Sequence, residues 1–273
     1  MKRLYSPAVA LEFFKFAGTP EKVPAGAAFF AENEKARPYL FMRDKMYLLI
    51  DGSVDLVARK KVIGTIARGE IFGEMAAISH APRSAGAVAK TACKVIALDD
   101  QQFRDGLQKK PEFALMLMSI MIGRLRETIA RLVAQNALSE DAAQKEMTVF
   151  DPKRLAQLVE GVSDDPPVYF DRGKTIVQEG HAGISMYAVL EGHVAVRIGV
   201  SIVERLGPGG VFGELALVEQ TPRLASAVAV TDCSLLPIGR NAFLALVRTS
   251  PDFAESLLGA LAERLRVLTA RLN

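Results

Sequence analysis

The chain contains one pattern twice, and this repeat limits what it can fold into. Residues 71–89 read IFGEMAAISHAPRSAGAVA, and residues 211–229 read VFGELALVEQTPRLASAVA. Ten of the nineteen aligned positions are identical, and matched residues lie 140 positions apart. A chain of 273 residues is long for one core and comfortable for two domains of roughly 100–200 residues each. The sequence therefore predicts two copies of one domain.

Short β-branched and aromatic runs fill the first part of each copy. KMYLLIDGSVDLVA (residues 45–58) and SMYAVLEGHVAVRI (residues 185–198) contain Asp-Gly and Glu-Gly pairs, which predict hairpin turns. Many short strands with glycine-rich turns are typical of a small antiparallel barrel or jelly roll. Behind the strands the hydrophobic period changes to that of helices, over residues 100–138 and 239–272.

The helical segments are each expected to break near a proline, Pro111 and Pro251. The predicted fold class is α+β, with two tandem antiparallel barrel or jelly-roll domains, each followed by C-terminal helices. The polar stretch SEDAAQKEMTVFDPKR (residues 139–154) places the boundary near residue 145, which predicts domains at 1–145 and 146–273. The first copy has seven extra residues between Ala31 and Lys45, which predict a longer surface loop.

The composition excludes several classes of function. A net charge of +3 is too small to indicate nucleic acid or a lipid surface. Two cysteines, Cys93 and Cys233, are too few for a disulfide framework or a cysteine-based metal site, and we expect small buried side chains there. No signal peptide, membrane-spanning run, metal motif or catalytic triad is evident, so a cytoplasmic protein that is not an enzyme is expected.

The repeated stretch carries the chemistry. Gly73 and Glu74 follow a strand, and the next residues predict one helical turn, whose N-terminal amides favour an anion. Arg83 supplies a planar charged fork suited to phosphate, and Ser84 adds a hydroxyl beside it. The Glu74 carboxylate accepts hydrogen bonds and suits a ribose hydroxyl. The set fits a nucleotide monophosphate; the alternative is an internal Glu–Arg ion pair that closes a turn.

The residues FGE-[ML]-A followed by PR-x-A resemble the phosphate-binding cassette of cyclic nucleotide-binding domains, which occur in catabolite activator proteins and kinase regulatory subunits. The resemblance implies that Glu74 and Glu214 hold the ribose 2′-hydroxyl and that Arg83 and Arg223 bind the cyclic phosphate. The ligand would be cAMP or cGMP, without a metal. The implied first cassette consists of Gly73, Glu74, Met75, Ala76, Arg83 and Ser84; the second consists of Gly213, Glu214, Leu215, Ala216, Arg223 and Leu224.

The copies differ from the family pattern in informative ways. Leu224 stands where a small or hydroxylic residue is usual, whereas Ser84 fits. In the helical segment after the first cassette, Arg124 and Thr128 resemble base-contacting residues of the bacterial activators, which favours cAMP over cGMP. The second copy has Arg264 and Leu268 at the matching positions. The first site is therefore expected to be better equipped to read a base, and binding at the second is left open.

A heptad-like seam in the first long helix suggests self-association. Its residues include Ile122, Leu125, Ile129 and Leu132, and the alternative is that this stripe packs on its own barrel. No helix-turn-helix or other output domain is recognisable, so no direct nucleic-acid contact is expected, nor membrane insertion. The sequence predicts a sensor that signals through an unidentified protein partner. The alternatives are an adaptor with vestigial pockets, or a regulator of transcription that acts through a separate DNA-binding partner.

Overall fold

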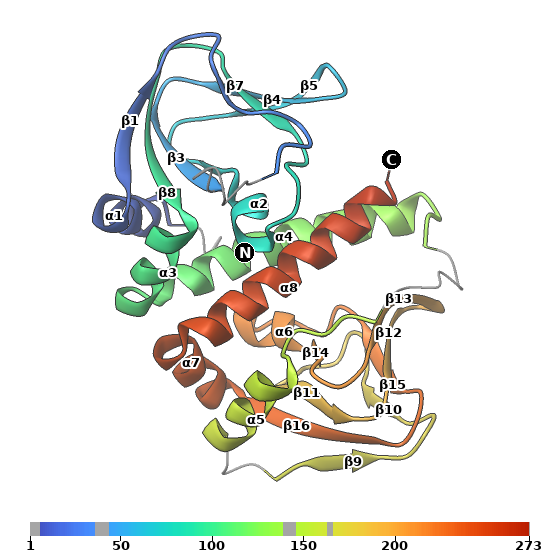
Figure 1. Ribbon diagram of the computed structural model, residues 1–273. Coiled ribbons are helices and arrows are strands. Elements are labelled where there is room, and N and C mark those ends of the chain that lie inside the picture. Colours follow the sequence, from blue (N-terminus) through green and yellow to red (C-terminus); the bar gives the residue numbers. More distant parts are fainter. Residues whose placement is uncertain (1–5, 36–43, 139–145, 163–165, 273) are drawn as a thin grey trace. The chain divides into compact units, whose positions relative to one another are not determined.

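The computed structural model describes residues 6–35, 44–138, 146–162 and 166–272 (Figure 1). The chain divides into two compact units, Met1–Leu117 and Met118–Asn273. This division falls inside helix α4 (Glu112–Ala134). The boundary near residue 145 that the repeat predicts lies outside the described residues, as does most of the predicted long loop between Ala31 and Lys45, and both stay predictions.

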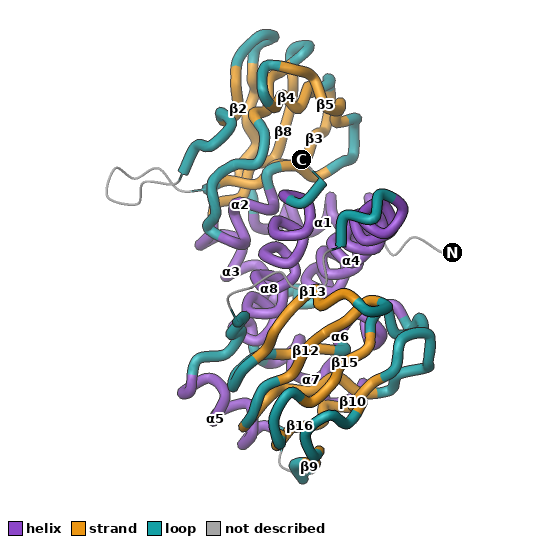
Figure 2. The backbone as a smooth tube through the Cα atoms, turned by 90° about the vertical axis from the view of Figure 1, so that its right-hand side faces the viewer, coloured by secondary structure: helices purple, strands orange, loops and turns teal. Residues whose placement is uncertain are grey.

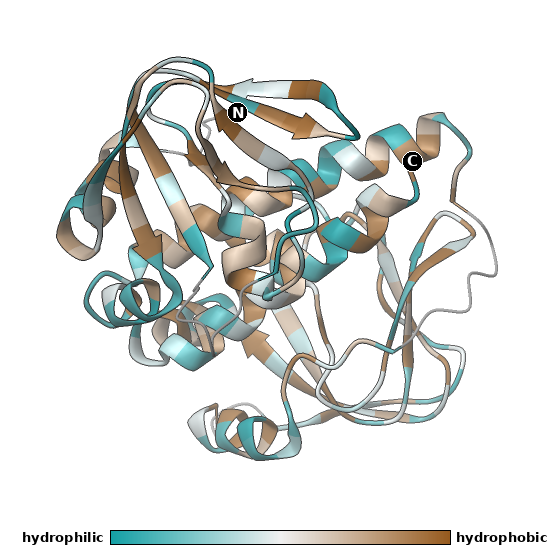
Figure 3. Ribbon diagram, turned by 45° about the horizontal axis from the view of Figure 1, so that its top comes forward, coloured by the Kyte–Doolittle hydropathy of each residue, from teal (hydrophilic) through white to brown (hydrophobic). Residues whose placement is uncertain are grey.

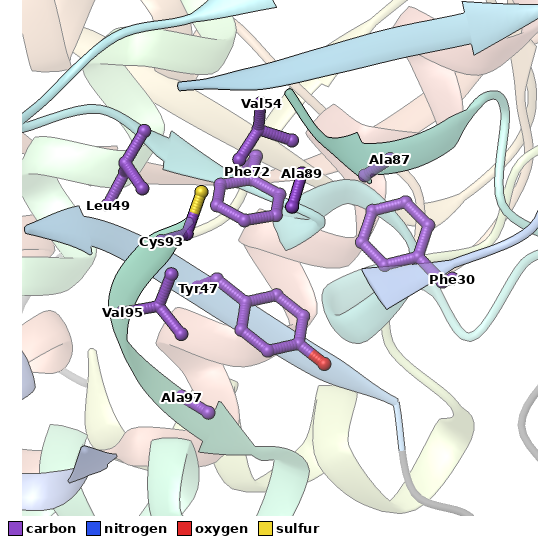
Figure 4. Packing of buried hydrophobic residues seen from close by; sticks show 10 residues of the cluster. All are labelled: Phe30, Tyr47, Leu49, Val54, Phe72, Ala87, Ala89, Cys93, Val95 and Ala97. Carbon is purple, nitrogen blue, oxygen red and sulfur yellow. The ribbon is translucent and has the colours of Figure 1, made fainter. Parts of the chain in front are cut away.

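Two four-stranded antiparallel sheets form the first unit, in the orders β1-β8-β3-β6 and β2-β7-β4-β5. Their inner faces enclose an apolar core in which Tyr47 and Phe72 stack with ring centroids 5.1 Å apart (Figure 4). The strands are β1 (Thr19–Val23), β2 (Ala28–Phe30), β3 (Lys45–Asp51), β4 (Val54–Ala58), β5 (Lys61–Ile66), β6 (Ile71–Phe72), β7 (Gly86–Ala89) and β8 (Cys93–Asp99).

The second unit repeats this topology, in the orders β14-β11-β16-β9 and β10-β15-β12-β13. Its core is again the space between two sheets, with Val189, Phe212 and Leu235 among the buried residues. The strands are β9 (Val168–Phe170), β10 (Thr175–Val177), β11 (Ser185–Glu191), β12 (Val194–Ile198), β13 (Ser201–Leu206), β14 (Val211–Phe212), β15 (Ser226–Ala229) and β16 (Cys233–Gly239). The predicted tandem antiparallel architecture is confirmed.

The predicted hairpins at the Asp-Gly and Glu-Gly pairs are wrong. Strands β3 and β4 flank Gly52 but belong to different sheets, because β3 pairs with β6 and β8 while β4 pairs with β5 and β7. Gly52 has φ of 98°, and a Cβ there would lie 2.6 Å from the Ala92 carbonyl oxygen. Gly52 therefore lies where the chain crosses from one sheet to the other, in close contact with a neighbouring strand. The sequence pattern around such a crossing is the same as that around a hairpin turn.

In each copy the last strand is followed along the chain by a short helix and then a longer one. Figure 2 draws the helices in purple. The predicted breaks at Pro111 and Pro251 are confirmed, and the predicted turn after each glycine is a six-residue helix. Helices α1 and α5 were not predicted from the sequence; Ser6-Pro7 and Asp151-Pro152 are their capping signals. The helices are α1 (Pro7–Ala17), α2 (Glu74–Ser79), α3 (Asp100–Lys109), α4, α5 (Pro152–Gly161), α6 (Glu214–Glu219), α7 (Arg240–Thr249) and α8 (Pro251–Ala270).

Hydrophobic residues are concentrated on the strands and along the long helices (Figure 3). Cys93 and Cys233 are free thiols that contribute to the two cores, as the sequence predicts. Within the described ranges, no helix combines the length and the apolar character needed to span a membrane. The same part of the chain contains no group of three histidine, cysteine or acidic residues that could hold a metal ion.

Candidate functional site

The two predicted arginines occupy equivalent and fixed positions. Arg83 donates from Nη1 to the Gly73 carbonyl oxygen at 2.7 Å and from Nη2 to the Lys45 carbonyl oxygen at 2.9 Å. Arg223 donates in the same way to Gly213 at 2.8 Å and Ser185 at 2.5 Å. Both side chains are buried, so burial lowers the pKa of each guanidinium. Each arginine is thus oriented by the backbone before a ligand arrives.

The glycines that begin the short helices are required by this geometry. Gly73 has φ of 78° and Gly213 has φ of 88°, a region that favours glycine. A Cβ at Gly213 would lie 2.6 Å from Nη1 of Arg223. Gly183 is equally constrained, because a Cβ there would overlap Nε of Arg223. A side chain at either position would therefore displace the arginine.

The first site contains a carboxylate that the sequence did not indicate. Asp44 Oδ1 lies 3.3 Å from Nη2 of Arg83, and both side chains are almost fully buried. The ring of Phe30 lies under the guanidinium, with its centroid 4.1 Å from Cζ. Burial raises the pKa of the Asp44 carboxyl, and Arg83 opposes that shift. The arginine of the first cassette is therefore already paired with an anion of its own domain.

The remaining residues of the first cassette lie around this pair. Glu74 and Ala76 are buried, Met75 is half-buried and Ser84 is exposed. Nε of Arg83 is buried and has no hydrogen-bond acceptor among the described residues. This N–H therefore lacks an acceptor, and a phosphate oxygen is a group that would supply one.

A cavity of about 650 Å³ adjoins the second cassette. Its lining includes Glu214 and Arg223 together with strand residues and residues of helices α4, α6 and α8. The size is within the range of roughly 300–1,000 Å³ that small-molecule pockets occupy. The structure brings all six predicted residues of the second cassette to this cavity: Gly213, Glu214, Leu215, Ala216, Arg223 and Leu224.

Arg264 on α8 holds the second cassette through two carboxylates. Its Nη1 donates to Glu214 Oε1 at 2.5 Å, and its Nε lies 3.0 Å from both oxygens of Glu204 on β13. Nη2 donates to the Val211 carbonyl oxygen at 2.6 Å. Burial alone would lower the pKa of Arg264, but the two carboxylates outweigh it and raise the pKa. The guanidinium therefore stays charged and acts as a cross-link between α8 and the barrel.

The other oxygen of Glu214 is left as an acceptor. Oε2 of Glu214 is buried and has no hydrogen-bond partner among the residues that the structure describes. A buried carboxylate oxygen without a donor is costly, and a hydroxyl group from a ligand would satisfy it. Arg264 on Oε1 and a ligand hydroxyl on Oε2 can thus share one carboxylate.

The residues predicted to read the base have different surroundings. Arg264 is engaged with acids, and Leu268 is an apolar wall of the second cavity. Arg124 is exposed and Thr128 is buried, and both belong to the second compact unit. Because the first cassette lies in the other unit, the assignment of these two residues to its pocket stays a prediction.

The predicted dimer seam is covered within a single chain. Leu125 and Ile129 line the second cavity, with exposed fractions of 3% and 7%. Ile122 and Leu132 are fully buried. Packing of this stripe on its own barrel is therefore not what Leu125 and Ile129 show, because both face the second cassette. A dimer through these residues stays a prediction.

Three features of the sites are not predictable from local sequence: Asp44, the Arg264 cross-link and the α4 side of the second cavity. A signal for Asp44 exists in the repeat, because Ile184 occupies the matching position and is 83% exposed. The two copies therefore differ at this position, with a buried acid in the first and an exposed apolar residue in the second. The other two features depend on packing over long sequence distances.

Replacing Asp44 by asparagine is expected to strengthen phosphate binding at the first cassette about fivefold to tenfold. The substitution removes a carboxylate that repels the incoming phosphate and preserves the side-chain size. The measurement is a calorimetric titration with cAMP in the Arg223→Ala background. Ile184→Asp is the matched change in the second copy and should weaken binding there in the Arg83→Ala background. Equal affinities with and without the Asp44→Asn substitution would show that the carboxylate does not compete.

Both halves of the chain match a known domain family. The family model described as "Cyclic nucleotide-binding domain" matches residues 20–110 and again residues 167–250, well over half of the chain. A cAMP-dependent protein kinase regulatory subunit from Eremothecium gossypii is 28% identical over 225 residues, which cover 82% of this chain and 42% of that protein. The cyclic AMP receptor protein of Thermus thermophilus is 42% identical over 102 residues, 36% of this chain and 47% of that one.

Among solved structures, the catabolite activator protein of Thermus thermophilus is 35% identical, with a TM-score of 0.39, covering 45% of this chain and 59% of that one. The chain spans half or less of the length of the curated relatives it matches. The two domain matches include both cassettes, and they confirm the resemblance that the FGE and PR residues indicate.

Proposed function

Because the chain belongs to the cyclic nucleotide-binding domain family, we propose that it is a regulatory protein whose cassettes bind a cyclic mononucleotide, with cAMP favoured over cGMP. The observation that carries the proposal is the second site. There Arg223 is pinned at the wall of a cavity of about 650 Å³, and Glu214 offers a buried oxygen without a donor. A cyclic phosphate and a ribose hydroxyl supply the two groups that this site needs.

The names of the relatives support cAMP as the ligand. Several relatives are cAMP-dependent protein kinase regulatory subunits, and the Thermus relative is a cyclic AMP receptor protein. These are regulatory proteins, which supports a role that is not enzymatic. We propose that this chain signals through a partner protein in the cytoplasm, without direct contact to nucleic acid.

The response to ligand is proposed to pass through α8. Arg264 joins this helix to Glu214, so the carboxylate that meets the ribose is also a contact of the helix. A ligand shifts a conformational equilibrium only by its differential affinity for the two states. A hydroxyl on Oε2 changes the charge density that Arg264 experiences, and this gives the ligand a direct effect on the position of α8.

The test is a calorimetric titration of the full chain with cAMP and then cGMP, reading stoichiometry as well as affinity. We expect two equivalents of cAMP per chain, because both arginines and both glutamates are present and buried. One equivalent would restrict the proposal to a single cassette. No heat with either nucleotide, together with an unchanged melting temperature, would overturn the proposal and favour an adaptor with vestigial pockets.

A further inference from the structure

We propose that the C-terminal half of α4 forms a wall of the second nucleotide pocket and that Arg126 holds it there. Leu125 and Ile129 would cover the ligand base, and α4 would respond to ligand at the second cassette. This inference rests on the proposed function, because it assumes that the cavity beside Glu214 and Arg223 receives a cyclic nucleotide. All the contacts described below lie within the compact unit Met118–Asn273.

Arg126 ties α4 to the segment that joins the two ligand-binding residues. Its Nε donates to Glu219 Oε2 at 2.8 Å, and its Nη2 donates to Thr221 Oγ1 at 2.5 Å. Glu219 ends α6, the helix that begins with Glu214, and Thr221 precedes Arg223 by two residues. The side chains of Arg126 and Glu219 are 24% and 12% exposed, so the pair is less screened than a surface ion pair.

The same part of α4 contributes side chains to the cavity. Leu125 and Ile129 are four residues apart, so they lie on one face of the helix. Both line the cavity that contains Glu214 and Arg223. With Arg126 attached to the cassette, this face of α4 is held toward the pocket rather than toward solvent.

Leu125 and Ile129 lie in the part of the cavity where the base of the ligand is expected. Arg223 and Glu214 are suited to the phosphate and the ribose, which leaves the base against the other walls of the cavity. Those walls include Val196 and Ile198 on β12, Val267 and Leu268 on α8, and Leu125 and Ile129 on α4. An aromatic base has apolar faces, and covering them removes apolar surface from water.

The contact between Arg126 and the second cassette has no equivalent in the first copy of the repeat. Arg266 is the counterpart of Arg126 in the second copy, and it pairs with Glu263 on its own helix. Ser79 and Ala81 in the first cassette match Glu219 and Thr221, so the first copy has neither partner. The arginine on α4 and its two acceptors therefore occur together only at the second pocket.

The test uses the full chain carrying Arg83→Ala. This substitution removes binding at the first cassette, so the measured binding comes from the second. Leu125→Ala, Ile129→Ala and Arg126→Gln are compared by calorimetric titration with cAMP and by the dissociation rate of a fluorescent cAMP analogue. Arg131→Ala is the matched control, because Arg131 is an exposed residue of the same helix. Melting temperatures without ligand report whether each variant is folded.

We expect each alanine substitution at Leu125 or Ile129 to weaken cAMP about tenfold, as the loss of a buried aliphatic contact implies. Arg126→Gln should speed dissociation about fivefold or more, Arg126→Lys should restore part of the loss, and Arg131→Ala should change nothing. Amide hydrogen exchange in residues 122–132 should slow on cAMP binding, and this slowing should be lost with Arg126→Gln. If Leu125→Ala does not fold, Ile129→Val and Arg126→Gln provide the same comparison.

The outcomes separate this inference from the function on which it rests. Normal cAMP affinity and dissociation in all α4 variants, with no ligand effect on exchange in α4, would refute the proposed role of α4 in the pocket. The proposed function would be unaffected by that result. Failure of the Arg83→Ala chain to bind cAMP at all would overturn both the function of the second cassette and the inference.

Discussion

Arg264→Ala is expected to lower the free energy of unfolding of the second unit by roughly 3–5 kcal/mol. The substitution leaves the buried Glu214 and the 14%-exposed Glu204 without the guanidinium that bonds to both. Removing one member of a buried ion pair is costly because the remaining charge has lost its solvation and its partner. The measurement is scanning calorimetry, because the chain has no tryptophan whose fluorescence could report unfolding.

Arg266→Ala is the matched control for this prediction. Arg266 is two residues away on α8 and pairs with Glu263, but the two side chains are 50% and 39% exposed. A surface pair contributes about 0–1 kcal/mol, so this substitution should hardly move the transition. If Arg264→Ala and Arg266→Ala have equal effects, the Glu204–Arg264–Glu214 contacts are not a structural cross-link.

Arg83→Ala and Arg223→Ala are each expected to remove one equivalent of bound cAMP from the chain. Each arginine is a buried cation that the backbone orients, and we expect the loss at the altered site to be roughly 2–5 kcal/mol. The measurement is the stoichiometry and affinity in a calorimetric titration. The double substitution should bind no cAMP.

Lysine substitutions provide the control for charge. Arg83→Lys and Arg223→Lys keep a cation but cannot donate to two carbonyl oxygens and a phosphate in one plane, so intermediate affinities are expected. Unchanged affinity in Arg83→Ala would mean that the first cassette is not a binding site. The same result in Arg223→Ala would remove the second, and each result stands independently of the other.

The surroundings of the two arginines differ more than the residue types of the two cassettes suggest. The first has Ser84 after its arginine, and it also has Asp44 beside the guanidinium. The second has Leu224 in place of a hydroxyl, and it has a large cavity with a free carboxylate oxygen. Local sequence favours the first site, whereas the surroundings of the second contain the groups that a nucleotide would meet.

The sequence alone determined the duplication, the strand-rich domains, the helix breaks and the paired Gly-Glu and Arg residues. These features depend on local rules: glycine at positive φ, proline at the first turn of a helix, and the period of apolar residues. A second copy at a constant offset of 140 residues made each local signal visible twice. That is why Gly73, Arg83 and their counterparts could be identified without a structure.

Only the tertiary structure decided which groups meet these residues. Arg264 contacts Glu214 across 50 positions and Glu204 across 60, and Arg126 contacts Glu219 across 93. The sheet crossing at Gly52 likewise follows from which strands pair, since an Asp-Gly pair serves a hairpin equally well. Such contacts depend on how α4, α8 and the strands pack, and spacing along the chain carries no information about partners so far apart.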